Sequence, residues 1–282
     1  METVAGIEAL RGRVAAWRAG GERIGFVPTM GNLHAGHLSL VDRARARADR
    51  VVVSVFVNPL QFGPGEDYET YPRTLEQDRA VLAEHRVDLL FAPPVEAMFP
   101  RGREETTFVE VPGLGAQLCG AFRPGFFRGV ATVVARLFNL VQPDLAVFGE
   151  KDYQQLVLVR RMVQDLAFPV EILGAPTVRE PDGLAMSSRN AYLTPEERRQ
   201  APLLYRTLCD LARELETGRS DYASLERAAM SRLEAGGFRP EYVAIRRAED
   251  LAAPGPETGS LRVLAAAWLG RARLIDNLPV ER

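Results

Sequence analysis

The chain lacks several features that would assign it to a protein class at once. Its 282 residues contain only two cysteines, Cys119 and Cys209, whose separation fits neither a disulfide framework nor a cysteine zinc site. No segment reaches the roughly twenty apolar residues that a membrane-spanning helix needs. The 35 basic residues are balanced by 37 acidic ones and form no tract, which disfavours a nucleic-acid partner.

The N-terminal residues do not look like a targeting segment either. Residues 1–17 alternate charged and apolar side chains at helical spacing, whereas a secretory leader needs an uninterrupted apolar stretch and a transit peptide avoids acids. We therefore expect an opening amphipathic helix, and a soluble, cytoplasmic protein without a membrane partner.

The first 175 residues alternate between strand and helix patterns. Residues 50–59 form a continuous β-branched run without alternation, which is typical of a strand buried on both faces of a parallel sheet. Strands that alternate with helices favour right-handed crossovers, so we predict an α/β fold with a doubly wound parallel sheet. The predicted strands are 23–29, 50–59, 87–93, 144–150 and 169–176, and the predicted helices after the first are 38–48, 74–85, 129–141 and 152–166.

The pattern changes near residue 176. Two helices, 195–216 and 220–235, are followed by alternating strands at 241–248, 261–270 and 273–280. This order predicts a smaller C-terminal α+β domain. We place the two domains at 1–175 and 176–282.

Doubly wound sheets bind ligands at the carboxyl ends of their strands, where the segment MGNLHAGH (residues 30–37) follows the first predicted strand. Gly31 and Gly36 allow a sharp turn into a helix, and the free amides at the start of that helix would form an anion site. His34 and His37 lie three residues apart, so both imidazoles can face the anion and donate to a phosphoryl oxygen. The alternatives are histidines satisfied within the protein, or a zinc site, for which His85 offers no obvious third ligand.

Other polar residues leave the same edge of the predicted sheet. Lys151 follows the strand at 144–150 and can neutralise a polyphosphate, while Asp152 is equally explained as a helix cap. Gln155 lies one turn after Lys151. Asn58 and Gln61 could bind a ligand with hydroxyl and carboxylate groups, although each could also be an ordinary turn or surface amide.

The segment MSSRN (residues 186–190) lies at the predicted domain junction. Its hydroxyl groups and guanidinium suit phosphate oxygens, although an ordinary serine-rich loop explains it as well. An HxGH turn early in the chain and this loop late in it, flanking a doubly wound sheet, are typical of nucleotidyltransferases that act on the α-phosphate of ATP.

Six motifs in order resemble the pantothenate synthetase (pantoate–β-alanine ligase) family of the HxGH nucleotidyltransferase superfamily. They are PTMGNLHAGHLSLV, VFVNPLQFG, YPRTLEQD, FRGVATVVARLFNLVQPDLAVFGEKDYQQL, MSSRNAYL and ARLIDN. The resemblance implies a Rossmann-like N-terminal domain that binds ATP and pantoate, a C-terminal lid domain and a homodimer. It also implies condensation of (R)-pantoate with β-alanine, using ATP with its Mg2+, to give pantothenate, AMP and pyrophosphate through a pantoyl-adenylate intermediate.

The resemblance also implies roles for particular residues. His37, His34 and Lys151 are the expected catalytic residues, Gln61 and Gln155 the pantoate-binding residues, and Gln61 the β-alanine-binding residue, with no metal ligand from the protein. Asn58, Tyr71 and Arg123 match positions that line the same cleft. The expected ATP-binding residues are Met30, Gly31, Asn32, Leu33, His34, Ala35, Gly36, His37, Gly149, Glu150, Lys151, Asp152, Val178, Met186, Ser187, Ser188 and Arg189.

One position departs from the family pattern. Phe126 stands where the family commonly has histidine, and phenylalanine can pack but cannot hydrogen-bond. Two other functions stay open at this stage: an HxGH transferase with another substrate, and a nucleotide-sensing protein that kept the fold and lost catalysis.

Overall fold

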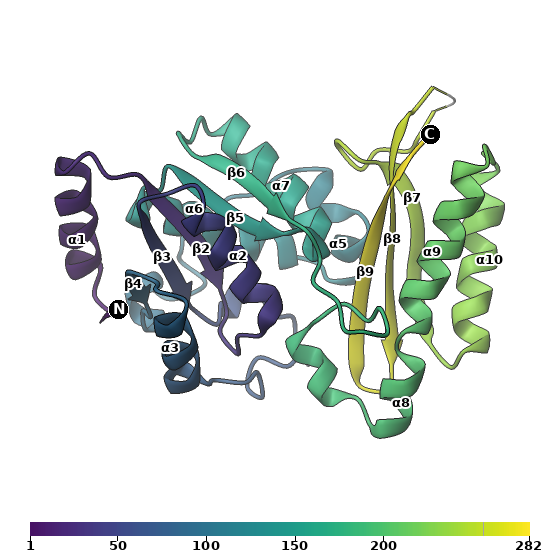
Figure 1. The fold of residues 1–282 in the computed structure, drawn as a ribbon, viewed down its shortest axis with the longest axis horizontal. Helices are drawn as coiled ribbons and strands as arrows, with labels where there is room; N and C mark the ends of the chain where they lie inside the picture. The colour runs from purple at the N-terminus through teal and green to yellow at the C-terminus, as the bar shows by residue number, and fades with distance from the viewer. Residues whose placement is uncertain (256) are drawn as a thin grey trace. The chain divides into compact units, whose positions relative to one another are not determined.

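The computed structural model describes residues 1–255 and 257–282, which divide into two compact units (Figure 1). The first unit comprises Met1–Glu150 and Leu158–Pro176, and the second comprises Lys151–Val157 and Thr177–Arg282. Each unit has its own sheet and its own core. In the described part of the chain, no helix is long and apolar enough to cross a membrane.

A six-stranded, all-parallel sheet organises the first unit (Figure 1). The strand order is β1-β4-β3-β2-β5-β6, so the direction of winding reverses between β2 and β5. Ligands bind at such a switch point, outside the carboxyl ends of the strands. The bounds are β1 Glu2–Val4, β2 Ile24–Thr29, β3 Arg50–Val55, β4 Leu89–Phe91, β5 Leu145–Gly149 and β6 Glu171–Ala175.

Helices cover both faces of this sheet, which confirms the predicted doubly wound fold. Successive residues of β2 point to opposite faces: Val27 packs in one core cluster with Leu40 of α2, and Phe26 meets Phe138 of α6 edge to face. The longer helices are α1 Ile7–Ala19, α2 Ala35–Arg45, α3 Leu75–Glu84, α6 Phe126–Val141 and α7 Tyr153–Asp165, the last of which begins in the second unit. The short segments are η1 Pro59–Gln61, α4 Val95–Met98, η2 Leu114–Ala116, α5 Cys119–Phe122 and η3 Glu150–Asp152.

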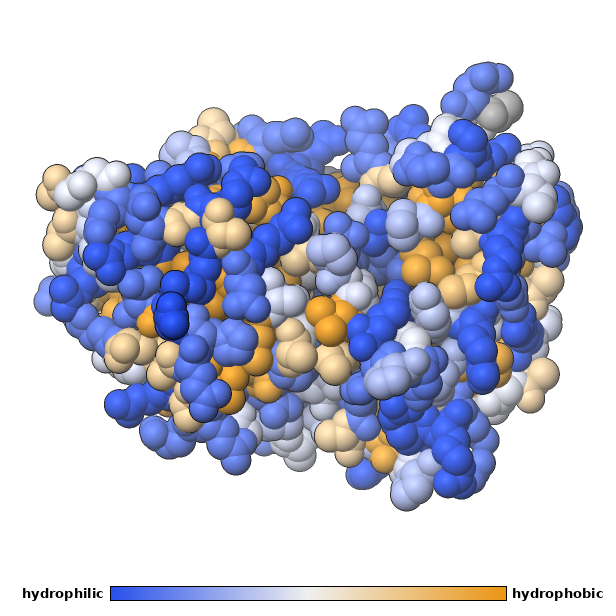
Figure 2. All heavy atoms as spheres, in the orientation of Figure 1, coloured by the Kyte–Doolittle hydropathy of each residue, from blue (hydrophilic) through white to orange (hydrophobic). Residues whose placement is uncertain are grey.

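The second unit contains the predicted antiparallel sheet, in the order β7-β8-β9. Its elements are η4 Ser188–Tyr192, α8 Pro195–Gln200, α9 Leu203–Glu216, α10 Tyr222–Ala235, β7 Arg239–Arg247, β8 Ser260–Leu269 and β9 Ala272–Glu281. Leu208 of α9 and Leu233 of α10 pack with Val263 of β8 in one core. The outward sides of these helices carry mostly hydrophilic side chains (Figure 2), as expected for amphipathic helices.

The opposite face of this sheet holds the segment Lys151–Val157. Arg262 of β8 alternates with the core-facing Val263 and stacks its guanidinium on the Tyr153 ring, 3.9 Å from the ring centroid. The Tyr153 hydroxyl donates to the Ala248 carbonyl at 2.9 Å. These contacts explain why a segment that we expected within residues 1–175 packs with the second unit.

Two predicted elements differ from the structure. Glu2–Val4 is not helical but pairs with β4 as an edge strand, and α1 begins only after Gly6. The predicted helix 195–216 is two helices, because Pro202 has no N–H to continue the hydrogen bonds of α8.

Candidate functional site

The chain turns sharply where it leaves β2 at the switch point. Gly31 and Asn32 both have positive φ, 81° and 52°. A Cβ on Gly31 would lie 2.9 Å from Asp78 Oδ2 and 3.0 Å from a Val55 methyl carbon, so a side chain would be crowded as well as strained. Glycine is therefore required here by both conformation and space.

Asp78 of α3 anchors this turn by accepting hydrogen bonds from its backbone. Its carboxylate is 2% exposed and accepts the Asn32 amide at 3.0 Å, the Leu33 amide at 2.8 Å and the Thr74 hydroxyl at 3.1 Å. Successive amides that converge on an anion form a nest, and here the anion is supplied by the protein. Sequence reasoning missed Asp78, because an aspartate in the first turn of a helix is ordinarily explained by the helix dipole.

His34 and His37 lie together at the start of α2. His34 Nδ1 accepts the Gly36 amide at 3.1 Å, and His37 Nδ1 accepts the His34 amide at 3.3 Å. The ring centroids are 4.1 Å apart. Because each Nδ1 accepts an N–H, a neutral ring carries its proton on Nε2, so each imidazole can donate from that atom.

The structure does not contain the expected anion site of free backbone amides at this turn. Most N–H groups of this turn donate to the protein itself: Gly31 to the Thr29 hydroxyl, Asn32 and Leu33 to Asp78, His34 and Gly36 to the imidazoles, and His37 to the His34 carbonyl. Donors towards a phosphate at this turn therefore come chiefly from the imidazole side chains.

The segment after β3 orients Gln61. Asn58, which is 1% exposed, donates to Gln61 Oε1 at 3.0 Å and to the Gly129 carbonyl at 3.1 Å, and its Oδ1 accepts the Leu60 amide at 3.2 Å. Gln61 Nε2 approaches the Met30 sulfur at 3.0 Å. Asn58 is thus a turn residue, as one alternative held, and it fixes which way the Gln61 amide points.

Arg123 braces the same segment. Its guanidinium donates to both Glu66 carboxylate oxygens, at 2.7 and 2.5 Å, and to the Gln61 carbonyl at 3.1 Å. It also stacks on Phe126, 3.7 Å from the ring centroid. Phe126 therefore holds Arg123 by stacking, a contact that needs no hydrogen bond.

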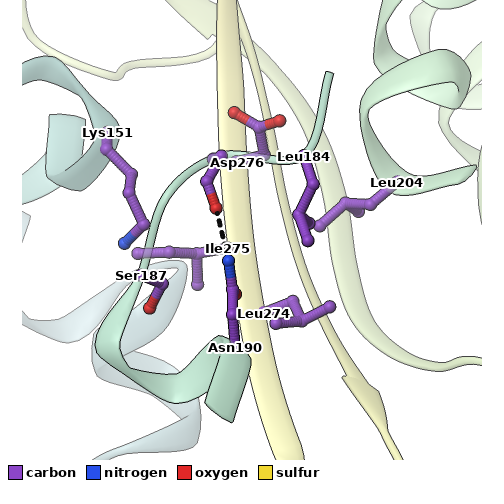
Figure 3. Close-up of a pocket in the computed structure, with 9 residues that line it drawn as sticks. Lys151, Leu184, Ser187, Asn190, Leu204, Leu274, Ile275 and Asp276 are labelled. Carbon is purple, nitrogen blue, oxygen red and sulfur yellow. Dashed lines mark hydrogen bonds between the residues drawn. The ribbon is translucent and has the colours of Figure 1, made fainter. Parts of the chain in front are cut away.

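In the second unit, Lys151 lines a small pocket with Ser187, Asn190 and Asp276 (Figure 3). Lysine occurs nowhere else in the chain, in which all other basic residues among the 35 are arginines. Lysine is a compact charge on a flexible stem, whereas arginine is a planar fork. That Lys151 is the single lysine of the sequence is a compositional signal for this position, beyond the motif that contains it.

The predicted residues of the 178–189 stretch are brought together by a tight hairpin. The Met186 amide donates to the Val178 carbonyl at 3.0 Å, and Ser187 Oγ accepts the Arg189 amide at 3.3 Å at the start of η4. Asp182 in the hairpin pairs with Arg198, whose hydrogen bond is the main reason that the pKa of Asp182 lies below its usual value.

The remaining predicted residues lie near the end of β5. Gly149 and Glu150 belong to the first unit, and the chain passes from them directly into Lys151 and Asp152. Lys151 Nζ lies 3.5 Å from Asp152 Oδ2. Gln155 is half-buried, whereas its neighbour Gln154 is 5% exposed, which leaves Gln155 as the more accessible amide.

No metal-binding cluster accompanies these residues. Within residues 1–255 and 257–282, no group of three or more His, Cys, Asp or Glu side chains could hold an ion.

A doubly wound sheet with a donor-bearing turn at its switch point defines an α/β protein of the nucleotide-binding class. Comparison with known proteins is more specific: the family model of pantoate-beta-alanine ligase matches residues 2–279. The chain belongs to the pantoate-beta-alanine ligase family and is an enzyme of that family, which confirms the resemblance predicted from its motifs.

Several relatives match over nearly their whole length. Pantothenate synthetase of Thioalkalivibrio sulfidiphilus is 61% identical over 281 residues, covering 100% of this chain and 98% of the relative. The crystal structure of pantothenate synthetase from Thermus thermophilus is 56% identical, with a TM-score of 0.93 and full coverage of both chains. The Francisella tularensis ligase, solved with beta-gamma ATP and beta-alanine, is 34% identical with a TM-score of 0.83, covering 99% and 97% of the two chains.

Proposed function

We propose that the chain condenses (R)-pantoate with β-alanine at the expense of ATP, giving pantothenate, AMP and pyrophosphate through a pantoyl-adenylate. Family membership over residues 2–279 carries the proposal. The Francisella tularensis relative, solved with beta-gamma ATP and beta-alanine, supports the choice of two of the substrates.

In this proposal ATP is bound by the turn after β2, the residues after β5 and the loop before η4. The imidazole Nε2 atoms of His34 and His37 donate to phosphoryl oxygens, and Lys151 and Arg189 supply positive charge. The ATP-binding residues are Met30–His37, Gly149–Asp152, Val178 through its backbone, and Met186–Arg189. Since the Asn32 and Leu33 amides are held by Asp78, these two residues would meet the nucleotide through other atoms.

In the first step a pantoate carboxylate oxygen attacks the α-phosphorus of ATP. The new P–O bond forms as the bond to the β-phosphate oxygen breaks, and pyrophosphate leaves. Negative charge grows on the phosphoryl oxygens during this displacement, and donors aimed at those oxygens stabilise it most when they are already oriented. The backbone contacts at both Nδ1 atoms provide that orientation.

Gln61 and Gln155 hold pantoate in this proposal, and Gln61 also serves β-alanine. Neutral amides orient the attacking carboxylate with less ground-state stabilisation than an arginine pair would give. The contact from Asn58 fixes the Gln61 amide with Nε2 as the group available to donate.

In the second step the uncharged amine of β-alanine attacks the acyl carbon of the adenylate. The C–N bond forms, the C–O bond breaks so that its oxygen leaves with AMP, and the amine nitrogen releases one proton to the solvent. Exclusion of water protects the adenylate, and we propose that residues 176–282 act as a lid for this purpose. Mg2+ would enter with the nucleotide as part of the substrate, and we propose a homodimer in the cytoplasm.

Isotope transfer tests the intermediate. Pantoate labelled with 18O in its carboxylate is incubated with MgATP, with β-alanine first withheld and then added. We expect an acyl-AMP mass in the first sample and one 18O atom in AMP in the second. Label in phosphate with release of ADP would mean an acyl phosphate instead and would overturn the proposed route.

A pyrophosphate exchange screen tests the substrate. Exchange into ATP should require pantoate and should not occur with other hydroxy acids or with amino acids. Exchange that depends on a different acid would identify another substrate, and tight ATP binding without any exchange would favour a nucleotide sensor.

A further inference from the structure

We propose that Asp276 and Asn277, consecutive on β9, are positioning residues that together hold Lys151 and the hairpin leading to Ser187. The inference deepens the proposed function, because it rests on Lys151 acting on the nucleotide. The two residues lie in the ARLIDN motif, for which neither the sequence nor the reaction has so far given a reason. Both are buried, at 3% exposure each.

Strand geometry sends the two side chains to opposite faces of the sheet. Asp276 pairs with Ala265, a member of the core beneath α9 and α10, and Asn277 pairs with Leu264, the next residue along β8. Consecutive polar residues can thus hold two separate segments of the second unit.

Asn277 holds the backbone of Lys151. Its Nδ2 donates to the Lys151 carbonyl at 2.8 Å, while its Oδ1 accepts Arg262 Nε at 2.6 Å. Arg262 is itself 5% exposed and stacks on Tyr153. The amide therefore needs both of its ends, one as donor and one as acceptor, and no other side chain of this size supplies that pair.

Asp276 holds the hairpin. Its two oxygens accept Arg179 Nη1 at 2.6 Å and Nη2 at 2.9 Å, a bidentate pair. Arg179 also donates to the Gly183 carbonyl at 3.1 Å and stacks on Tyr205, 4.0 Å from the ring centroid. Since the Arg179 backbone forms an isolated β-bridge with Ala185, the Arg179–Asp276 ion pair fixes the segment that leads into Ser187.

These contacts fix the backbone from which the flexible Lys151 side chain extends. A lysine stem has four rotatable carbons, so the position of its ammonium depends on where its backbone is held. Lys151 and Ser187 line the same pocket, and β9 fixes the segment of each (Figure 3). An error of about 1 Å in such a position can cost a hundredfold in rate.

The replacement Asn277→Asp isolates the contact with Lys151. It keeps the size of the side chain and the acceptor for Arg262, and it puts an oxygen where the donor to the Lys151 carbonyl was. We expect adenylate formation to slow by about tenfold or more, with the KM for ATP changed less than threefold. Asn139→Asp, at an exposed position of α6, introduces the same charge and should change the rate less than twofold.

A double-mutant cycle separates positioning of Lys151 from general support of the fold. In a Lys151→Met background, Asn277→Asp should slow adenylate formation less than twofold. An equal loss in both backgrounds would overturn the inference. If Lys151→Met itself keeps full activity, it is the proposed role of Lys151 that fails instead.

The single lysine provides a direct spectroscopic readout. Protein labelled with [1-13C]lysine has one labelled backbone carbonyl signal, that of Lys151, which is the group that Asn277 contacts. Asn277→Asp should shift this signal, and Asn139→Asp should leave it in place. An unmoved signal in Asn277→Asp would overturn the inference whatever the rates show. Should that variant not fold, as judged by circular dichroism, Asn277→Ser replaces it in both measurements.

Discussion

The structure allows the effect of replacing Asp78 by asparagine, which exchanges one side-chain oxygen for nitrogen, to be worked out. Its buried carboxylate accepts two backbone amides and one hydroxyl under the turn that carries the imidazoles. Asp78→Asn turns one acceptor oxygen into an NH2 group, so in either orientation a backbone amide, that of Asn32 or that of Leu33, must face a donor. Losing a charge-assisted hydrogen bond and leaving a buried N–H unpaired should together cost about 2–4 kcal/mol of unfolding free energy.

The same change should also alter catalysis. Asn32 and Leu33 precede His34 directly, so a shift of the turn moves both imidazoles. We expect adenylate formation to fall by about tenfold or more in the folded variant. Urea unfolding measures the stability and single-turnover quench experiments measure the rate, with Asp165→Asn, at an exposed position of α7, as the matched control.

Two results would refute this reasoning. A loss of stability below about 0.5 kcal/mol, as seen for ordinary surface substitutions, would mean that the carboxylate is not needed by the amides. A large loss of stability with an unchanged rate would mean that the turn does not set the geometry of the imidazoles.

Three further predictions concern the surroundings of the site. Gly129→Ala would push a methyl group into the η1 backbone and should lower the stability by about 1–3 kcal/mol. It should also lower the affinity for pantoate, measured by calorimetry, and a wild-type affinity would mean that the packing of Gly129 against η1 does not set the position of Gln61. Phe126→Ala removes the ring under Arg123 and should raise the KM for pantoate severalfold, with Phe126→Tyr as a control that keeps it. Asp182→Asn should cost less than about 1 kcal/mol at neutral pH, because its ion pair is exposed. Its lowered pKa stabilises the fold above the ordinary carboxyl value of 3.8, so the difference from wild type should vanish as the pH falls through and below the folded-state pKa; a constant difference in the urea midpoint across that range would contradict this.

Much of the fold is predictable because its pattern is local. Buried strands such as 50–55 and periodic helices such as α6 are visible as runs and repeats of apolar residues. The strand Glu2–Val4 was not predictable, because an edge strand of three residues has too little pattern of apolar residues. Its pairing with β4 also joins segments far apart in the sequence. Pro202, by contrast, was a readable signal for the break between α8 and α9.

The candidate site likewise combines local features, which the sequence predicts, with long-range contacts, which it does not. The spacing of His34 and His37 and the turn that carries them are local features, and motifs located them. Asp78 and Asn277 were not assigned roles because their effect depends on contacts across 45 or more residues, to Leu33 and Lys151. The expectation of free amides was wrong partly for the same reason, since the Asn32 and Leu33 amides donate to the distant Asp78 carboxylate, while those of His34 and Gly36 donate to the neighbouring imidazoles.

The central claim is that the imidazole donors at the start of α2 stabilise charge that develops while AMP is transferred. His37→Asn tests it most directly, because an asparagine oxygen can accept the His34 amide in place of Nδ1 while the Nε2 donor is lost. Rapid-quench measurement of pantoyl-adenylate formation, with ATP binding measured separately, should show the rate reduced by about a hundredfold or more and the ATP Kd changed less than threefold. A wild-type rate, or an ATP affinity that falls by as much as the rate, would contradict the account.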